Sequence, residues 1–139
     1  MEYTYHTMEI GDYDEIYALW SSDPGIGLSE ADNRDNIAAY LLRNPDQSFV
    51  CKANSKIIGT ILCGNDGRRA YIHHTAVATE YRRQGIATQL TDMALEEQKK
   101  YGMTKCHLFI ISDNEPGKAF WLKSGFFERY DIGIMSKEF

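Results

Sequence analysis

The chain lacks the residue patterns that mark several classes of protein. Its three cysteines, Cys51, Cys63 and Cys106, are odd in number, widely spaced and free of any C-x-x-C pair. This spacing argues against a disulfide framework and against a metal site built from cysteines. We therefore expect reduced thiols within strands and a cytoplasmic location. No apolar run approaches the length of a membrane span. The first residues, 1–4, lack the basic-then-apolar start of a secretory signal.

A basic excess and metal-binding patterns are missing as well. The chain has 15 Lys and Arg against 20 Asp and Glu, a formal net charge of −5, whereas general nucleic-acid binders normally carry a basic excess. Its four histidines show no H-E-x-x-H spacing, and no G-x-S-x-G elbow is present. We therefore expect no nucleic-acid or membrane partner, no metal and no serine nucleophile.

What remains is the pattern of a single globular α/β domain. A length of 139 residues with 43% hydrophobic and 25% charged content suits one self-sufficient domain spanning 1–139. Hydrophobic periods of strands and helices alternate along it, which favours a mixed α/β sheet. We predict strands at 3–10, 48–53, 56–63, 70–78 and 106–111, a final hairpin at 126–135, and helices at about 12–21, 30–43, 85–101 and 116–125. The predicted order is β-α-α-β-β-β-α-β-α-β-β.

The most informative segment is a strand that runs through a basic turn into a helix. The turn reads Arg82-Arg83-Gln84-Gly85-Ile86-Ala87, and the following Ile86, Leu90, Met93 and Ala94 share one helical face. The first turn of a helix has unpaired N–H groups that attract anions. Only Gly85 is present, so the three-glycine dinucleotide fingerprint does not fit, and no P-loop sequence follows. Alone, the pattern also fits an ordinary β–α connection with solvated arginines.

The surrounding residues narrow the interpretation. Ala76-Val77-x-x-Glu80-Tyr81-Arg82-Arg83-x-Gly85-Ile86-Ala87 resembles the acetyl-CoA motif of the GCN5-related N-acetyltransferase (GNAT) family. Asn114, followed by Trp121 and Ser124-Gly125-Phe126, resembles the family's late N…Y-x-x-x-G-F segment. The resemblance implies the GNAT-like acyl-CoA N-acyltransferase fold. It also implies acetyl-CoA as co-substrate and direct acetyl transfer, in a ternary complex, to a primary amine of a small molecule or peptide.

The same resemblance assigns roles to individual residues. The turn from Arg83 to Thr88 would hold the CoA pyrophosphate through backbone N–H groups, and the strand before it would pair with the pantetheine arm. The N–H of Val77 would be the oxyanion donor. The implied CoA-binding residues are Thr75, Ala76, Val77, Arg82, Arg83, Gln84, Gly85, Ile86, Ala87, Thr88, Asn114, Lys118 and Trp121. Simpler roles stay open for some of them: Ala76 and Val77 as strand core, Asn114 as a helix N-cap and Lys118 as a solvated surface charge.

The chain departs from the family at three catalytic positions. Trp121 stands where many members carry a tyrosine acid, and indole is a hydrogen-bond donor too weak to serve as an acid. Trp121 would therefore donate a hydrogen bond to the CoA sulfur or simply form part of the pocket wall. Phe109 replaces a glutamate base of some relatives, and Tyr71 replaces an acid of others. The replacements at Trp121 and Phe109 leave open an alternative function, that of a non-catalytic CoA-binding sensor or scaffold.

Two histidines on the strand are the remaining titratable candidates. Strand side chains alternate, so we expect His73 on the face of Thr75 and Val77, with His74 on the opposite face. His73 is the candidate base for the amine, directly or through water, and His74 is expected to be structural. A structural role for either histidine and a water chain as the base remain alternatives.

The acceptor side and the oligomeric state are less specified by sequence. In the family, the segment that joins the two early helices rims the acceptor pocket, and residues 23–28 here hold two glycines around Ile26. They suggest an apolar lid, although a plain surface turn fits as well. An exposed edge at residues 126–139 could support a homodimer.

Overall fold

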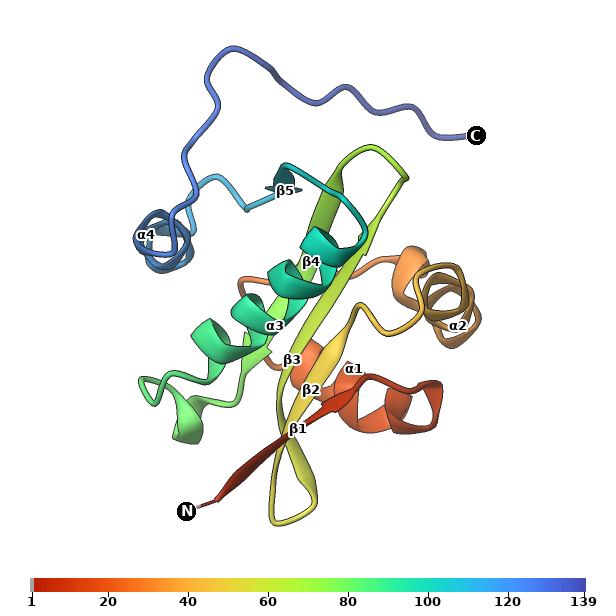
Figure 1. Cartoon of the computed structure of the whole chain (residues 1–139), viewed down its shortest axis with the longest axis vertical. Coiled ribbons are helices and arrows are strands. Elements are labelled where there is room, and N and C mark those ends of the chain that lie inside the picture. The colour runs from red at the N-terminus through yellow and green to blue at the C-terminus, as the bar shows by residue number, and fades with distance from the viewer. Residues whose placement is uncertain (1) are drawn as a thin grey trace.

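A computed structural model describes residues 2–139 and shows one five-stranded sheet. The strands, in spatial order, are β1 (Tyr3–Thr7), β2 (Phe49–Ala53), β3 (Lys56–Asn65), β4 (Ala70–Val77) and β5 (Cys106–Leu108). Neighbouring strands are antiparallel except β4 and β5, which are parallel. The helices are α1 (Tyr13–Ser21), α2 (Arg34–Arg43), α3 (Ile86–Lys100) and α4 (Glu115–Lys123), with 3-10 turns η1 (Ile10–Asp12), η2 (Glu30–Asp32) and η3 (Thr79–Tyr81). Figure 1 shows this arrangement.

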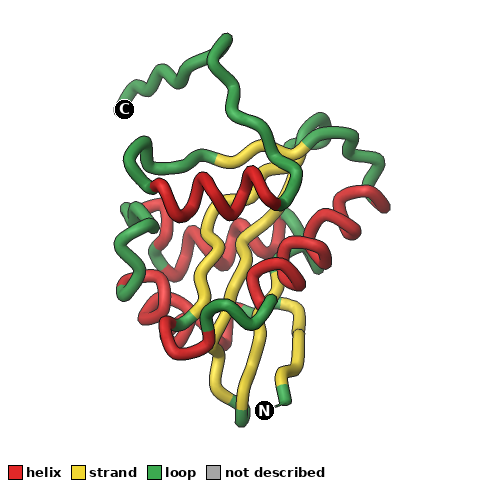
Figure 2. The backbone as a smooth tube through the Cα atoms, turned by 90° about the vertical axis from the view of Figure 1, so that its left-hand side faces the viewer, coloured by secondary structure: helices red, strands yellow, loops and turns green. Residues whose placement is uncertain are grey.

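The sheet separates two hydrophobic cores, and helices lie on both of its sides (Figure 2). On one side, α3 packs Ile86, Leu90 and Ala94 against strand residues such as Ile58 and Ile61. The predicted apolar face of this helix is therefore confirmed. On the other side, α1 and α2 pack against a second set of strand residues. That core contains Met8, Tyr13, Ile16, Trp20, Ile37, Val50, Ile57, Leu62 and Ala76.

Several elements differ from the sequence-based prediction. The strand expected at 3–10 ends at Thr7, and Ile10 begins η1 instead. The helix expected at 30–43 is divided, because Asn33 has an extended backbone and its side chain accepts the N–H of Asn36 to cap α2. The strand expected at 106–111 ends at Leu108. Within residues 2–139, no helix is both long and apolar enough to cross a bilayer.

The predicted final hairpin is not formed. Residues 126–139 contain no helix or strand, and the tail leaves the body of the molecule in Figure 1. Large apolar side chains such as Phe127, Ile132 and Ile134 are exposed there. The three-residue β5 gives the tail only a short edge to pair with, and an isolated hairpin is marginal in water.

One strand glycine is fixed by close packing. A Cβ added to Gly64 of β3 would lie 2.5 Å from the Tyr40 hydroxyl and 2.6 Å from Cγ of Asn44. Asn44 is buried, and its Oδ1 accepts the N–H of Asn65, so this side chain cannot move without breaking a hydrogen bond. The packing of α2 on β3 therefore requires a residue without a side chain at position 64.

We predict that Gly64→Ala lowers the free energy of unfolding by about 1–3 kcal/mol, the usual cost of overpacking. Urea denaturation measures the change. Gly11→Ala is the matched control, because a Cβ at Gly11 meets nothing within 4 Å. Equal stability of the two variants would contradict this account of the contact.

Candidate active site

A β-bulge interrupts β4 near its centre. The pairing with β3 runs from Ile61 opposite Thr75 to Cys63 opposite Ile72, so two residues of β4 face a single residue of β3. The extra residue rotates the side chains that follow it relative to those before it. The residues at the bulge are His73 and His74. The expectation that they lie on opposite faces is wrong for this reason.

Both histidines lie on the side of the sheet covered by α1 and α2. The ring of His74 packs edge-on against Trp20 of α1 with 4.7 Å between centroids, and the ring of His73 packs edge-on against Tyr40 of α2 at 5.6 Å. Val77 belongs to the core on the α3 side instead. The sequence-based expectation that His73 shares a face with Val77 is therefore wrong.

Beyond the bulge, one edge of β4 has no neighbouring strand. β5 pairs only with residues 70–72 of β4. The N–H of Ala78 donates to Ile58 of β3 at 2.8 Å. Because successive N–H groups of a strand point to opposite edges, those of Thr75 and Val77 point away from β3. The open edge thus presents the N–H donors of Thr75 and Val77, whereas the N–H of Ala76 points toward β3.

The open edge leads directly into the N-terminus of α3. Arg83 and Gly85 both have left-handed backbone conformations, with φ of 62° and 80°. Gly85 is the N-cap of α3, and no side chain caps this end. The first N–H groups of the helix, at Ile86, Ala87 and Thr88, are therefore left to an external acceptor. Successive N–H groups in such a turn form a concave site that suits an anion.

The polar side chains of the turn are held by the protein itself. Nε of Arg82 donates to the carbonyl of Val77 at 3.0 Å, and its Nη2 lies 3.8 Å from Asp23 of the loop after α1. Gln84 is hydrogen-bonded to the hydroxyl of Tyr3 in β1. The arginine thus ties the loop after α1 to the end of β4 without using the backbone N–H groups of the turn.

One hydroxyl on β4 is left without a partner. Oγ1 of Thr75 is buried and makes no hydrogen bond, the single such side-chain atom among residues 2–139. A buried polar group without a partner costs free energy. Thr75 also carries one of the two N–H groups of the open edge, so the unpartnered hydroxyl belongs to a residue whose N–H could serve a ligand lying along β4.

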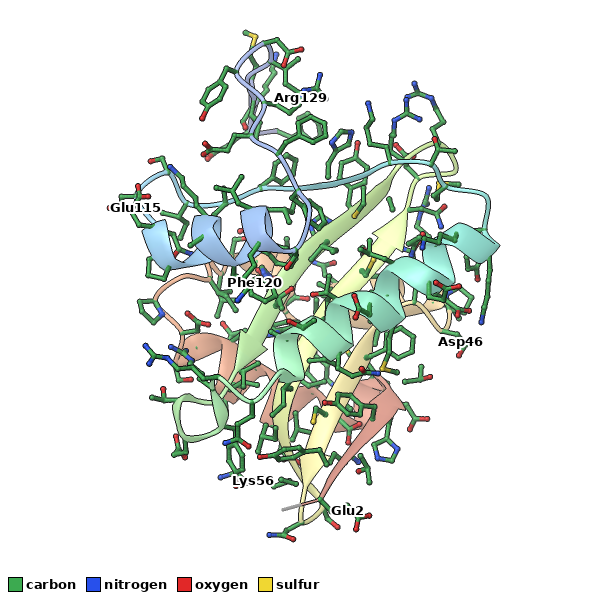
Figure 3. The ribbon with its side chains drawn as sticks, turned by 60° about the vertical axis from the view of Figure 1, so that its left-hand side comes forward. Glu2, Asp46, Lys56, Glu115, Phe120 and Arg129 are labelled. Atoms are coloured by element: carbon green, nitrogen blue, oxygen red, sulfur yellow. The ribbon has the colours of Figure 1, made fainter. Side chains whose placement is uncertain are left out.

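The late motif residues lie on α4 and at its start. Asn114 is the N-cap of α4, since its Oδ1 accepts the N–H of Gly117 at 3.0 Å. Its amide also lies against Gly25 of the acceptor-side loop. Lys118 lies 3.8 Å from both Glu115 and Glu128. α4 and α3 lie on the same side of the sheet (Figure 3).

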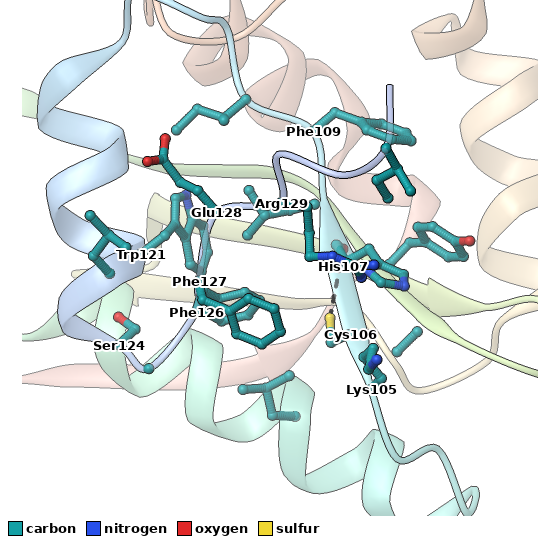
Figure 4. Close-up of a pocket in the computed structure, with 18 of the residues that line it drawn as sticks. Lys105, Cys106, His107, Phe109, Trp121, Ser124, Phe126, Phe127, Glu128 and Arg129 are labelled. Atoms are coloured by element: carbon teal, nitrogen blue, oxygen red, sulfur yellow. Dashed lines mark hydrogen bonds between the residues drawn. The ribbon is translucent and has the colours of Figure 1, made fainter. Parts of the chain in front are cut away.

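Trp121 is part of an aromatic cluster beneath α4. Its ring packs edge-on against Phe120 and Phe126, with centroids 4.8 and 5.1 Å away. It also lines a cavity of about 760 Å³ between β5, α3, α4 and the tail, shown in Figure 4. We interpret this larger cavity as space that the tail would fill if it paired with β5, because residues 126–134 form much of its wall.

A second, smaller pocket opens beside the bulge. It has a volume of about 330 Å³ and is lined by Gly25, Ile26, Gly27, His73, His74, Phe109, Ile110 and Ile111. The loop predicted to rim an acceptor site thus faces both histidines. The walls are apolar, and the histidines supply the titratable groups.

Sequence reasoning missed the residue that anchors His74. Asp32 of η2 is only 7% exposed, and its Oδ1 lies 2.7 Å from Nε2 of His74. Its Oδ2 accepts the N–H of Ser29, which completes a capping box around η2. The signal in the sequence was the Ser29-x-x-Asp32 pattern, which predicts a cap but not a histidine partner. No group of three or more His, Cys, Asp or Glu that could hold a metal occurs within residues 2–139.

Comparison with known proteins identifies the class. The sequence model of the Acetyltransferase (GNAT) family matches residues 13–126. N-alpha-acetyltransferase 30 of Schizosaccharomyces pombe is 38% identical over 104 residues, which cover 71% of this chain and 69% of that protein. The PaiA N-acetyltransferase of Thermoplasma acidophilum, solved with coenzyme A, superposes with a TM-score of 0.80 at 19% identity and covers 96% of this chain and 94% of its own.

A third protein, in the NatC complex bound to Gag peptide and CoA, gives a TM-score of 0.78 at 22% identity and covers 93% of this chain and 87% of its own. At such identities these two structures establish the shared fold. The family model and the 38% identical relative establish membership: the chain belongs to the GNAT family of acetyltransferases. The resemblance drawn from its two motifs is thereby confirmed.

The environment of His73 makes a prediction about its titration. His73 is exposed as a residue, but its ring lies between Tyr40 and Tyr71. The resulting desolvation lowers the pKa of His73 below the usual histidine value, the neighbouring His74 lowers it further, and Asp32 acts in the opposite direction. We expect an NMR titration midpoint below about 6.5. The unfolded chain then binds this proton more readily, so the free energy of unfolding falls as the pH drops from about 6.5 toward the lower folded pKa.

His73→Gln should therefore reduce the slope of stability against pH in that window and leave stability above neutral pH little changed. His107, whose pKa is also lowered, first by burial and then by nearby cations such as Arg129, accounts for part of the remaining slope. A His73 midpoint at or above the ordinary histidine value would refute the assignment.

Proposed function

We propose that this protein transfers the acetyl group of acetyl-CoA directly to a primary amine within a ternary complex. One observation carries the proposal: the unpaired edge of β4, where the N–H of Val77 points away from β3, leads into the uncapped N-terminus of α3. A strand edge suits an extended ligand that contains amides, and a helix N-terminus suits a phosphate. Acetyl-CoA combines both features in one molecule.

The residues along this path fit the co-substrate. The N–H of Thr75 and its unpaired hydroxyl would satisfy pantetheine amides, and the turn from Arg83 to Thr88 would hold the pyrophosphate through its backbone. The N–H of Val77 would stabilise negative charge on the thioester oxygen during attack. In the next peptide group, the carbonyl of Val77 accepts a hydrogen bond from Nε of Arg82, which restrains the end of β4 just after this donor.

The side chains of the late motif have narrower roles in this proposal. Asn114 presents its amide beside Gly25, between the donor edge and the acceptor-side loop. Lys118 is engaged by two carboxylates, so a phosphate would have to compete with them. Trp121 bounds the donor site from α4 and can donate to sulfur but cannot supply an acidic proton. The CoA thiolate would then leave unassisted.

The acceptor pocket favours an amine that carries an apolar neighbour. Ile26, Phe109 and Ile111 supply apolar surface, and Phe109 is 59% exposed. Two carboxylates that contact residues of its lining are already engaged, Asp23 with Gly25 and Arg82, and Asp32 with His74. Neither of them is free to bind a polycation. We infer a peptide α-amine as the acceptor, which agrees with the name of the 38% identical relative, an N-alpha-acetyltransferase.

The thiols support the expected location. All three cysteines are free, and Cys51 and Cys63 are buried. Burial raises the pKa of Cys63 to about 12, which keeps this thiol protonated and unreactive. Reduced, inert cysteines suit a cytoplasmic enzyme.

The donor site makes a specific prediction. Gly85 has φ of 80°, and a Cβ there meets no atom within 4 Å, so Gly85→Val acts through backbone strain and not through a clash. We expect this variant to lose the thermal stabilisation that acetyl-CoA gives the wild type, while Arg82→Ala only weakens it. Gly67→Val is the matched control, with φ of 89° and equally open surroundings in the turn between β3 and β4. Undiminished acetyl-CoA binding by Gly85→Val would refute the assignment of the acetyl-CoA site to the N-terminus of α3.

The reaction is tested by amine-dependent release of CoA thiol. Peptides with a free N-terminus and an apolar first residue should give the largest kcat/KM, ahead of N-terminally blocked peptides, free amino acids, polyamines and aminoglycosides. Gly85→Val serves as the inactive control. Thermal stabilisation by acetyl-CoA without release from any acceptor would favour the sensor or scaffold function, and release with polyamines alone would overturn the peptide assignment.

A further inference from the structure

We propose that His74, oriented by Asp32, is the base that removes the proton from the acceptor ammonium group. The inference rests on the proposed function and adds to it the residue that carries the proton. It replaces the sequence-based choice of His73 and adds Asp32, for which the sequence pattern predicts only a capping role.

Three separate elements build the arrangement around His74. β4 supplies His74 at the bulge, η2 supplies Asp32, and α1 supplies Trp20. The Asp32 carboxylate lies 2.7 Å from Nε2, and the Trp20 ring packs edge-on against the imidazole. Trp20 is fully buried and is itself fixed, since its Nε1 donates to Oγ1 of Thr60 at 2.9 Å. The imidazole therefore has a defined orientation.

The contact with Asp32 also determines which ring nitrogen is basic. A carboxylate can only accept hydrogen bonds, so Nε2 of a neutral His74 must carry the hydrogen and donate it. Nδ1 then holds the lone pair that can accept a proton. The same relation between a carboxylate, a histidine tautomer and a free basic nitrogen underlies general-base histidines in other enzymes.

Nδ1 of His74 is the ring nitrogen that the contact with Asp32 leaves free. It has no hydrogen-bond partner within residues 2–139, because the contact to Asp32 uses Nε2. It is also absent from the buried, unpartnered atoms, which comprise only Oγ1 of Thr75. His74 lines the 330 Å³ pocket beneath Ile26. In this proposal the Nδ1 lone pair accepts the proton of an amine that enters this pocket.

His73 lines the same pocket but has no group to orient it. Its neighbours are the aromatic rings of Tyr40 and Tyr71, and no carboxylate or carbonyl fixes its tautomer. The lowered pKa of His73 also makes this ring a poorer proton acceptor than an ordinary histidine. We assign His73 to the pocket wall.

The proton balance of the step is complete. The ammonium of the acceptor gives one proton to Nδ1 of His74, and the neutral nitrogen then attacks the thioester carbon as the C–N bond forms. When the C–S bond breaks, the electron pair leaves with sulfur, and the second proton of the attacking nitrogen passes to that thiolate. The products are the amide and CoA thiol, and imidazolium His74 returns its proton to solvent.

The surroundings of His74 limit which groups can share its pH dependence. Asp32 faces it from η2 and His73 adjoins it on β4, whereas α1 presents Trp20 and the pocket wall across from it is apolar. If a variant loses the acid-side fall of kcat/KM, the titrating group can therefore be sought among His74, His73 and Asp32.

Asp32→Asn is the most informative test. The amide keeps an oxygen for the N–H of Ser29 but presents N–H to Nε2, which would transfer the ring hydrogen to Nδ1 and block the base. Two-bond ¹H–¹⁵N spectra of histidine-labelled protein should show the Nε2–H tautomer of His74 in the wild type and the Nδ1–H tautomer in the variant. With the best peptide acceptor, kcat/KM should fall about 100-fold with unchanged acetyl-CoA affinity.

Three further variants complete the experiment. His74→Asn should lose the acid-side fall of kcat/KM, and His73→Asn should keep it. Ser29→Ala, which opens the capping box without touching His74, should stay within about threefold of the wild type. If Asp32→Asn and His74→Asn both keep wild-type turnover, or if His73→Asn alone loses the acid-side fall, the inference is wrong while the transferase function stands. Absence of turnover in the wild type would instead refute the proposed function.

Discussion

The structure depends on one constraint, the early separation of β5 from β4. Pairing stops at Ile72, so the rest of β4 keeps a free edge in the middle of the molecule. A free edge is normally a liability that proteins cover. Here it continues into the uncapped first turn of α3, and the two together form one path lined with N–H groups. Everything proposed for the donor follows from that path.

The bulge in β4 gives the same strand a second use. It turns His73 and His74 to the side of α1 and α2 while Thr75 and Val77 keep their N–H groups on the open edge. One short segment therefore serves a donor at its edge and an acceptor on its face. Arg82 and Asp32 hold this geometry from both sides, since each joins β4 to the segment that follows α1.

Local patterns predicted the parts of the molecule that depend on neighbouring residues. The apolar face of α3 and the glycine turn at Gly85 that precedes it follow from periodicity and backbone preference, and the structure shows both. The bulge could not be predicted, because it depends on register with β3 and strict alternation was assumed. Asp32 was missed because its partner lies 42 residues away. The hairpin predicted within residues 126–139 was wrong. The apolar pattern of this segment suits a strand, but β5 offers only a short edge for it to pair with.

The free edge itself can be measured directly by amide hydrogen exchange with and without acetyl-CoA. The account predicts that acetyl-CoA slows exchange at Thr75 and Val77 and at the turn from Arg83 to Thr88. The amide of Ala76, which faces β3, should change little. Protection confined to β5, α4 and the cavity beside the tail, with no change along β4, would contradict the account.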